Sequence, residues 1–155
     1  MEEGKGRVVR LAAVAAALMV AFVISALAPG CSTAKSKRED LITQLCEAAE
    51  AFNKFFKWGD FDGAAAFVDP KSMETYARWV AEYEDRFMAE SFRVMSCTLD
   101  DPEDTEPPFE ATVVVRYKGV VILPEARRRD YVWVQKWEFH GENWLVQPEF
   151  SVFER

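Results

Sequence analysis

The spacing of hydrophobic residues separates a helical first half of the chain from a strand-rich second half. Apolar residues recur at steps of three and four over residues 36–57, 61–68 and 70–90, which is the repeat of amphipathic helices. Ser36 and Glu39 have the spacing of a capping box. Asp69-Pro70 is typical of a helix start. We therefore expect three helices before residue 91.

After residue 91 the hydrophobic repeat changes to two, as in strands that are buried on one face. The alternation predicts four strands, at residues 92–99, 109–118, 131–139 and 144–150. Helices followed by strands indicate an α+β fold. We expect about three helices packed on a curved antiparallel sheet of about four strands.

The first 30 residues carry a different pattern. Basic residues at positions 5–10 precede an uncharged apolar run over positions 11–27, the layout of a secretory signal. The run ends in Leu27-Ala28-Pro29-Gly30-Cys31, which resembles a bacterial lipobox. The resemblance implies that Cys31 is lipidated and becomes the new N-terminus. It divides the chain into a signal peptide at 1–30, a lipidated cysteine with its tether at 31–39, and a folded domain at 40–155.

An uncleaved signal anchor, with Cys31 as an ordinary residue, is the alternative for this segment. Both readings place the domain outside the cytoplasm and on a bacterial membrane. The lipobox resemblance implies the periplasmic face of the outer membrane if the cell has two membranes. Acyl chains would retain the protein there, because each buried methylene contributes about 0.8 kcal/mol.

The charge balance narrows the choice of partners. The chain has 26 acidic and 19 basic residues, a net charge of -7, which argues against nucleic acid as a partner. The acidic loop at 100–106 lacks the ligand pattern of a calcium loop. Arg127, Arg128 and Arg129 are expected to face water in a turn. We predict no catalytic residue, metal ligand or cofactor, since the sequence has one histidine and no CxxC motif.

Two cysteines remain besides Cys31. In an oxidising envelope Cys46 and Cys97 either form a disulfide bond or stay apart as two small buried side chains.

Aromatic residues on the predicted inner face have two interpretations. They either line a ligand pocket around a central glutamine or form the core between sheet and helices. The candidate pocket residues are Trp58, Tyr76, Trp79, Tyr117, Tyr131, Trp133, Gln135 and Trp137. His140, beside Gly141 in a predicted turn, is expected to lie outside any such pocket.

Two stretches resemble the nuclear-transport-factor-2-like superfamily, the cystatin-like or SnoaL-like cone fold. They are residues 51–65, with the turn Gly59-Asp60-Phe61 before an alanine-rich segment, and the closing hairpin at 136–144. The resemblance covers residues 40–152 and implies a cone that encloses a pocket. Enzymes of that superfamily place an acidic base inside the cone, for which Asp60, Asp62 and Glu138 are the candidates here.

We therefore expect a lipid-anchored envelope domain that acts without catalysis. Its expected partners, besides the membrane, are a small apolar ligand or another envelope protein, and the resemblance also implies a homodimer through the outer sheet face. The alternative is a small isomerase or dehydratase of the same fold.

Overall fold

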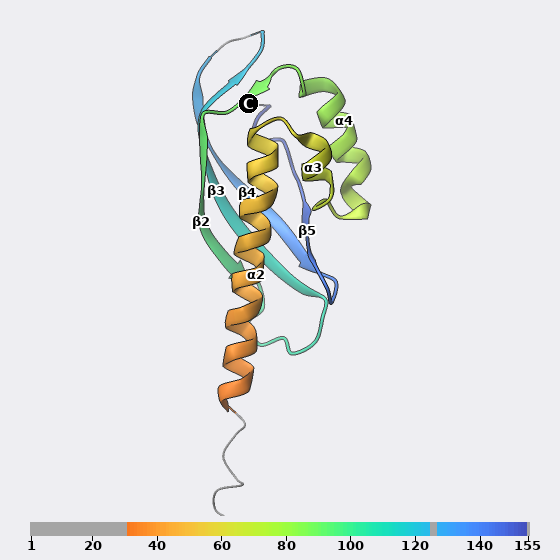
Figure 1. Ribbon diagram of the computed structural model, residues 1–155, viewed down its shortest axis with the longest axis vertical. Coiled ribbons are helices and arrows are strands. Elements are labelled where there is room, and N and C mark those ends of the chain that lie inside the picture. The colour runs from red at the N-terminus through yellow and green to blue at the C-terminus, as the bar shows by residue number, and fades with distance from the viewer. Residues whose placement is uncertain (1–30, 125–126, 155) are drawn as a thin grey trace, which may run out of the picture. The chain divides into compact units, whose positions relative to one another are not determined.

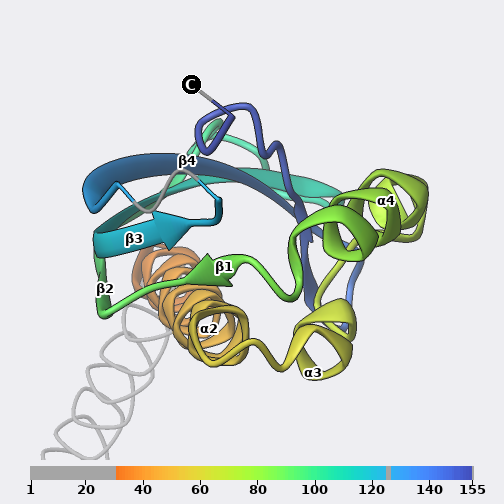
Figure 2. The ribbon, with the colours of Figure 1, turned by 90° about the horizontal axis from the view of Figure 1, so that it is seen from above.

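The computed structural model describes residues 31–124 and 127–154. The chain divides into two compact units, Met1–Lys37 and Arg38–Arg155. In the first unit, residues 31–37 are helical, and the predicted signal peptide lies outside the described residues. The second unit holds the rest of this helix, the other helices and all the strands given below, and Figure 1 and Figure 2 together label all of them except the short 3-10 helix.

The helices come first in the chain. They are α2 (Cys31–Lys57), α3 (Phe61–Ala65), the short 3-10 helix η1 (Pro70–Ser72) and α4 (Met73–Tyr83). The apolar repeat of α2 forms a continuous buried face, because Leu45, Ala49, Phe52 and Phe56 are fully enclosed. Burial of this face explains why the hydrophobic period predicted the helix.

Capping residues set the boundaries of the short helices. Gly59, with a φ of 71°, follows α2 in a conformation that suits glycine. The side chain of Asp60 accepts a hydrogen bond from the Gly63 amide at the start of α3. Asp69 accepts one from the Lys71 amide in the same way at the start of η1. Both aspartates therefore satisfy amides that the helices leave free.

Three expected helix boundaries are wrong. α2 begins at Cys31 rather than at Ser36, so the segment expected as a tether is helical; it contains no glycine or proline and is rich in good helix formers. α3 ends at Ala65 because Val68 forms a parallel bridge with Val146. α4 ends at Tyr83 because residues 87–88 join the sheet instead.

One antiparallel sheet of five strands, not four, follows the helices. Its strands are β1 (Phe87–Met88), β2 (Ser91–Leu99), β3 (Phe109–Ile122), β4 (Arg129–Phe139) and β5 (Trp144–Gln147). The long strand β3 pairs with β4 on one side and with β2 and then β1 on the other. β5 extends the sheet beyond β4.

Gly119 lets β3 continue past its expected end at residue 118. The register between β3 and β4 shifts between Tyr117 and Val120, and Gly119 has a φ of 62°. Its amide donates a hydrogen bond to Asp130 Oδ1 over 3.0 Å. Beyond this irregularity Val121 and Ile122 pair with β1. A two-residue strand has no alternation, which is why the hydrophobic pattern missed β1.

The core lies between the helices and one face of the sheet. Figure 2 shows the sheet curving over α2. The ring of Phe56 on α2 packs against Trp133 of β4, with 5.3 Å between ring centroids. Trp79 of α4 stacks on Phe150 at 4.4 Å. The α+β arrangement and the inward side of each long strand therefore follow the sequence pattern.

A disulfide bond joins α2 to the sheet. Cys46 of α2 and Cys97 of β2 are bonded, with their Cα atoms 5.9 Å apart. Of the two interpretations of this cysteine pair, the structure has the bonded one. Across residues 31–124 and 127–154, none of the helices is both long and apolar enough to cross a membrane.

Candidate functional site

The predicted aromatic pocket is filled by the protein's own side chains. Trp133 and Trp137 are each 1% exposed. Rings from other elements surround Trp133 at centroid distances of 5.2–6.2 Å; they are Phe52, Phe56, Tyr117, Phe150 and Phe153. The core interpretation of these aromatics is therefore the one that the structure supports, because α2 and the C-terminal residues close the concave face.

Gln135, expected as the polar group of a pocket, belongs to a buried hydrogen-bond network. Its amide nitrogen donates to Asn53 Oδ1 over 2.9 Å, and Asn53 Nδ2 donates back to Gln135 Oε1 over 3.1 Å. The Tyr117 hydroxyl also donates to Asn53 Oδ1, over 2.7 Å. Asn53 and Gln135 are 0% exposed. The network gives every amide nitrogen and oxygen of Asn53 and Gln135 at least one partner within the protein.

Two buried tyrosines have perturbed acidity. Burial raises the pKa of Tyr117 well above its usual value, with a smaller contribution from the negative charge of Glu50. Burial also raises the pKa of Tyr76, and the charges of Asp62 and Asp60 add to the effect. The Tyr76 hydroxyl donates to the backbone oxygen of Phe61 over 2.7 Å. Both phenols therefore act as neutral structural donors.

Trp58 lies apart from the other predicted pocket residues. It is 72% exposed, just beyond the end of α2. With Phe55, Ala51, Lys54 and Asp60 it lines a surface hollow of about 350 Å³. The prediction that Trp58 shares a pocket with the sheet residues is wrong, because the last turn of α2 places it outside the core.

The carboxylates considered as enzymatic bases are not inside the core. Asp60 and Asp62 are exposed, and Asp60 caps α3. Glu138 lies on the opposite face of β4 from Trp137, with 15% of its side chain exposed. None of these three candidate carboxylates therefore lies in the concave interior.

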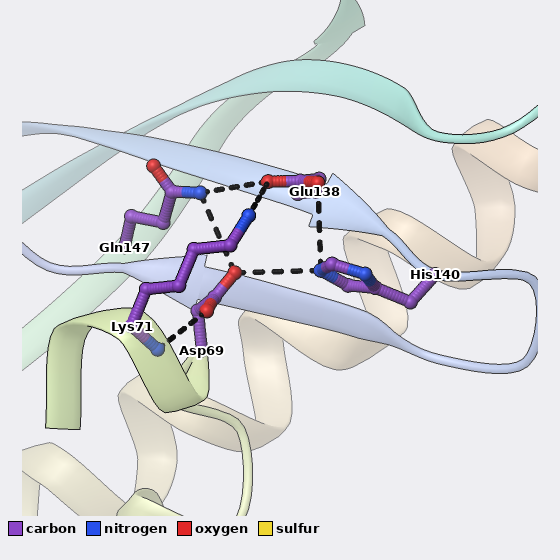
Figure 3. A network of polar contacts seen from close by, with 5 residues as sticks. All are labelled: Asp69, Lys71, Glu138, His140 and Gln147. Atoms are coloured by element: carbon purple, nitrogen blue, oxygen red, sulfur yellow. Dashed lines mark hydrogen bonds and ion pairs between the residues drawn. The ribbon is translucent and has the colours of Figure 1, made fainter.

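A compact polar cluster lies at the end of the β4–β5 hairpin, and Figure 3 shows its five members. We call it the Asp69 cluster; it consists of Asp69, Lys71, Glu138, His140 and Gln147. Asp69 reaches it because the backbone of residues 67–69 bonds to Val146 of β5. Glu138 and His140 are two residues apart along the chain, and Gln147 lies on the neighbouring strand.

Asp69 is the buried member of the cluster, with 1% exposure. Its Oδ2 atom lies 3.3 Å from His140 Nε2 and 3.4 Å from Gln147 Nε2. Burial by itself raises the pKa of Asp69. The hydrogen bonds from Lys71, His140 and Gln147, together with the Lys71 charge, outweigh it and leave the pKa lowered. Asp69 is therefore held as a carboxylate.

Sequence reasoning missed this cluster. The sequence pattern predicts His140 only as a turn residue and Asp69 only as a residue at a helix start. Asp69 and His140 are 71 residues apart in the sequence, and the link between them is an isolated bridge from Val68 to Val146. The two-residue spacing of Glu138, in β4, and His140, directly after it, is the one local signal.

The outer face of the sheet is the second feature with functional potential. Val132 and Val134 of β4 are 50% and 53% exposed. Val114 of β3 is the register partner of Val134. We call these three residues the valine patch. Asp130 and Lys136 follow at its two ends along β4, and Lys136 also pairs with Asp100 over 2.9 Å.

The acidic loop and the arginine cluster are surface segments, although Arg129 is the first residue of β4 and is only partly exposed rather than facing water in a turn. Asp100 accepts hydrogen bonds from Thr112 and Lys136. Arg128 pairs with Glu90. Within the described residues, the group of three carboxylate or imidazole side chains close enough to share an ion is Asp69, Glu138 and His140.

No protein-family model, curated protein or solved structure matches the chain. The resemblance to the nuclear-transport-factor-2-like superfamily therefore stays a prediction.

Proposed function

We propose that the protein is a lipid-anchored, extracytoplasmic binding module with a cone-type domain, and that it acts through protein contacts rather than catalysis. The observation that supports this most is the valine patch, where two aliphatic side chains of β4 are half exposed on the outer face of the sheet. The concave face offers no comparable surface, because aromatic rings fill it. Exposed apolar side chains ringed by polar ones are typical of protein interfaces.

We infer that the partner on this face is a second copy of the chain. The outward positions of β4 read Asp130, Val132, Val134 and Lys136. Two copies of β4 can be placed face to face and antiparallel, with a two-fold axis midway between the two valines. Val132 of one copy then faces Val134 of the other. The same alignment sets Asp130 against Lys136 at both ends.

Such an arrangement suits a two-fold symmetric dimer, in which the same patch must complement itself. Apolar side chains meet at the centre and opposite charges meet on either side. Charge pairs of this kind fix the register of an interface more than they strengthen it.

Charge reversal gives a sharp test of the self-complementary face. Asp130→Lys alone and Lys136→Glu alone each place like charges at both ends of a homodimer, so each variant should dimerise weakly. A mixture of the two variants restores opposite charges at both ends of the heterodimer. We expect differently tagged copies to co-purify from the mixture and not from either variant alone.

Matched variants away from the patch provide the control. Thr75→Lys and Glu82→Lys on α4 introduce charge on exposed positions and should leave dimerisation unchanged. A substitution that merely unfolded its chain would still do so in the mixture, because each chain keeps its own substitution. Association of the two variants in the mixture would therefore show that the weak dimerisation of each variant alone is not a folding defect. If the mixed variants associate no better than each alone, the self-association proposal fails.

The lipid anchor has its own test. Metabolic labelling with an alkyne palmitate analogue should label the full chain, and Cys31→Ala should abolish the label. An unlabelled wild-type chain, or label that persists in Cys31→Ala, would overturn the lipoprotein part of the proposal and favour the uncleaved signal anchor. The charge-reversal test measures self-association and not lipidation, so the dimer and the lipid anchor can each be disproved independently.

A further inference from the structure

The Asp69 cluster has the composition of a metal site rather than of a simple ion pair. Three side chains with ligand atoms converge from two separate parts of the chain: Asp69, Glu138 and His140. Their nearest ligand atoms all lie within 4.8 Å of one another. One imidazole and two carboxylates form a set that suits zinc and related divalent transition metals.

The spacing of these atoms fits a single ion. His140 Nε2 lies 3.3 Å from Asp69 Oδ2 and 3.6 Å from Glu138 Oε1. Ligands at bond lengths of about 2.0–2.1 Å in a tetrahedral site are separated by about 3.3 Å. These two distances are close to this value, and the third, between the two carboxylates, is at most 4.8 Å, so side-chain rotations that shorten this third distance would bring the three atoms around one ion.

The remaining oxygen atoms of the two carboxylates are held by other groups. Asp69 Oδ1 accepts a hydrogen bond from the Lys71 amide over 2.8 Å. Glu138 Oε2 accepts one from Gln147 Nε2 over 2.9 Å. Second partners of this kind orient the ligands of metal sites. Figure 3 shows Gln147 between the two carboxylates, opposite the imidazole.

Lys71 is the group that competes with a bound cation. Its ammonium lies 3.7 Å from Glu138 Oε2, but 71% of its side chain is exposed. The side chain can therefore leave the cluster with only a small change in buried surface. Asp69 and Glu138 together carry two negative charges, which Lys71 alone does not balance.

We propose that Asp69, Glu138 and His140 bind one divalent transition-metal ion, with Zn²⁺ as the first choice, and that Lys71 occupies the neighbouring space when the ion is absent. Three protein ligands leave a fourth position open. His140, with 39% of its side chain exposed, makes the site accessible from solvent.

Zn²⁺ titration of the full chain, purified in detergent and stripped with a chelator, tests the site. We expect one Zn²⁺ per chain by calorimetry, a rise in the thermal midpoint with Zn²⁺, and at least a tenfold loss of affinity in His140→Gln. Lys71→Met should instead bind Zn²⁺ more tightly, because it removes the competing ammonium. Glu142→Gln, an exposed carboxylate two residues from His140, is the matched control and should bind as the wild type does.

A purely structural ion-pair cluster gives different results. Lys71→Met would then lower stability without increasing Zn²⁺ affinity, and His140→Gln would bind the ion as the wild type does. Absence of stoichiometric binding to the wild-type chain, or either of these two results, overturns the proposal. The near-ultraviolet circular dichroism spectrum verifies that each variant is folded.

Discussion

Asn53 connects α2 to two strands of the sheet through side-chain hydrogen bonds. Its side chain donates to Ala49 and Gln135 and accepts from Tyr117 and Gln135. All the sheet partners lie among aromatic rings, where an unpaired polar group is expensive. The Asn53 side chain therefore provides hydrogen-bond partners for two buried side chains, those of Tyr117 and Gln135.

Asn53→Leu should lower the free energy of unfolding by about 1–3 kcal/mol for each buried partner that loses its bond. Denaturant unfolding measures the change. Tyr117→Phe should cost less in the Asn53→Leu background than in the wild-type chain, because the phenol has then lost its acceptor at 2.7 Å and keeps only the backbone oxygen of residue 53, 3.4 Å away.

Asn143→Leu, at an exposed asparagine in the β4–β5 turn, provides the comparison. It should change stability by less than about 0.5 kcal/mol. Full additivity of Asn53→Leu and Tyr117→Phe would contradict the network as the source of the effect.

At the scale of elements, the Cys46–Cys97 bond ties a helix to a strand that comes 51 residues later. A cross-link of that span restricts the unfolded chain and stabilises the fold by about 4 kcal/mol on the chain-entropy estimate. Cys46→Ala/Cys97→Ala should therefore unfold at lower denaturant concentration by a corresponding amount.

Mass spectrometry after alkylation identifies the bond directly. Neither Cys46 nor Cys97 should be alkylated in protein from an oxidising envelope until a reductant is added. Free alkylation of both thiols in the unreduced, denatured protein would exclude the bond.

The sequence predicted long elements well and short ones poorly. α2, α4 and β3 carry repeats of apolar residues over several turns or pleats, so the core faces were visible without a structure. α3 and β1 contain five and two residues, too few to show a period. Their ends depend on pairing with β5 and β3, which is information from distant parts of the chain.

Prediction of the candidate sites from the sequence is limited in the same way, and more severely, because the sites also depend on contacts between distant parts of the chain. Apart from Trp58, the predicted aromatic positions face inward, but a sequence does not tell whether rings line a cavity or fill it. That outcome depends on Phe150 and Phe153, which follow the last strand and pack against Trp133. The Asp69 cluster depends on an isolated bridge, so the spacing of Glu138 and His140 is its one trace in the sequence.

At the scale of the whole molecule, ionisation of the buried tyrosines is linked to unfolding. The pKa values of Tyr76 and Tyr117 are raised in the folded state, chiefly by burial. Their contribution to stability is complete below the unfolded pKa of about 10 and is lost as the pH rises through the folded pKa. Stability should therefore fall steeply above pH of about 10.

Absorbance of the phenolate against pH measures this link. We expect the signal of these two tyrosines to appear together with the loss of far-ultraviolet circular dichroism. In Tyr76→Phe/Tyr117→Phe the alkaline loss of stability should be shallower. Reversible ionisation of all tyrosines while the protein stays folded would contradict the assignment.

Trp58 differs from the other tryptophans in its exposure to solvent. Of its five tryptophans, four are at most 4% exposed and Trp58 is 72% exposed. The ammonium of Lys57 lies 4.0 Å from the Trp58 ring and attracts anions to it. An anionic collisional quencher such as iodide therefore reaches one emitter and leaves the other four fluorescent, so the native protein carries a single-site reporter of the solvent at the end of α2 without any label.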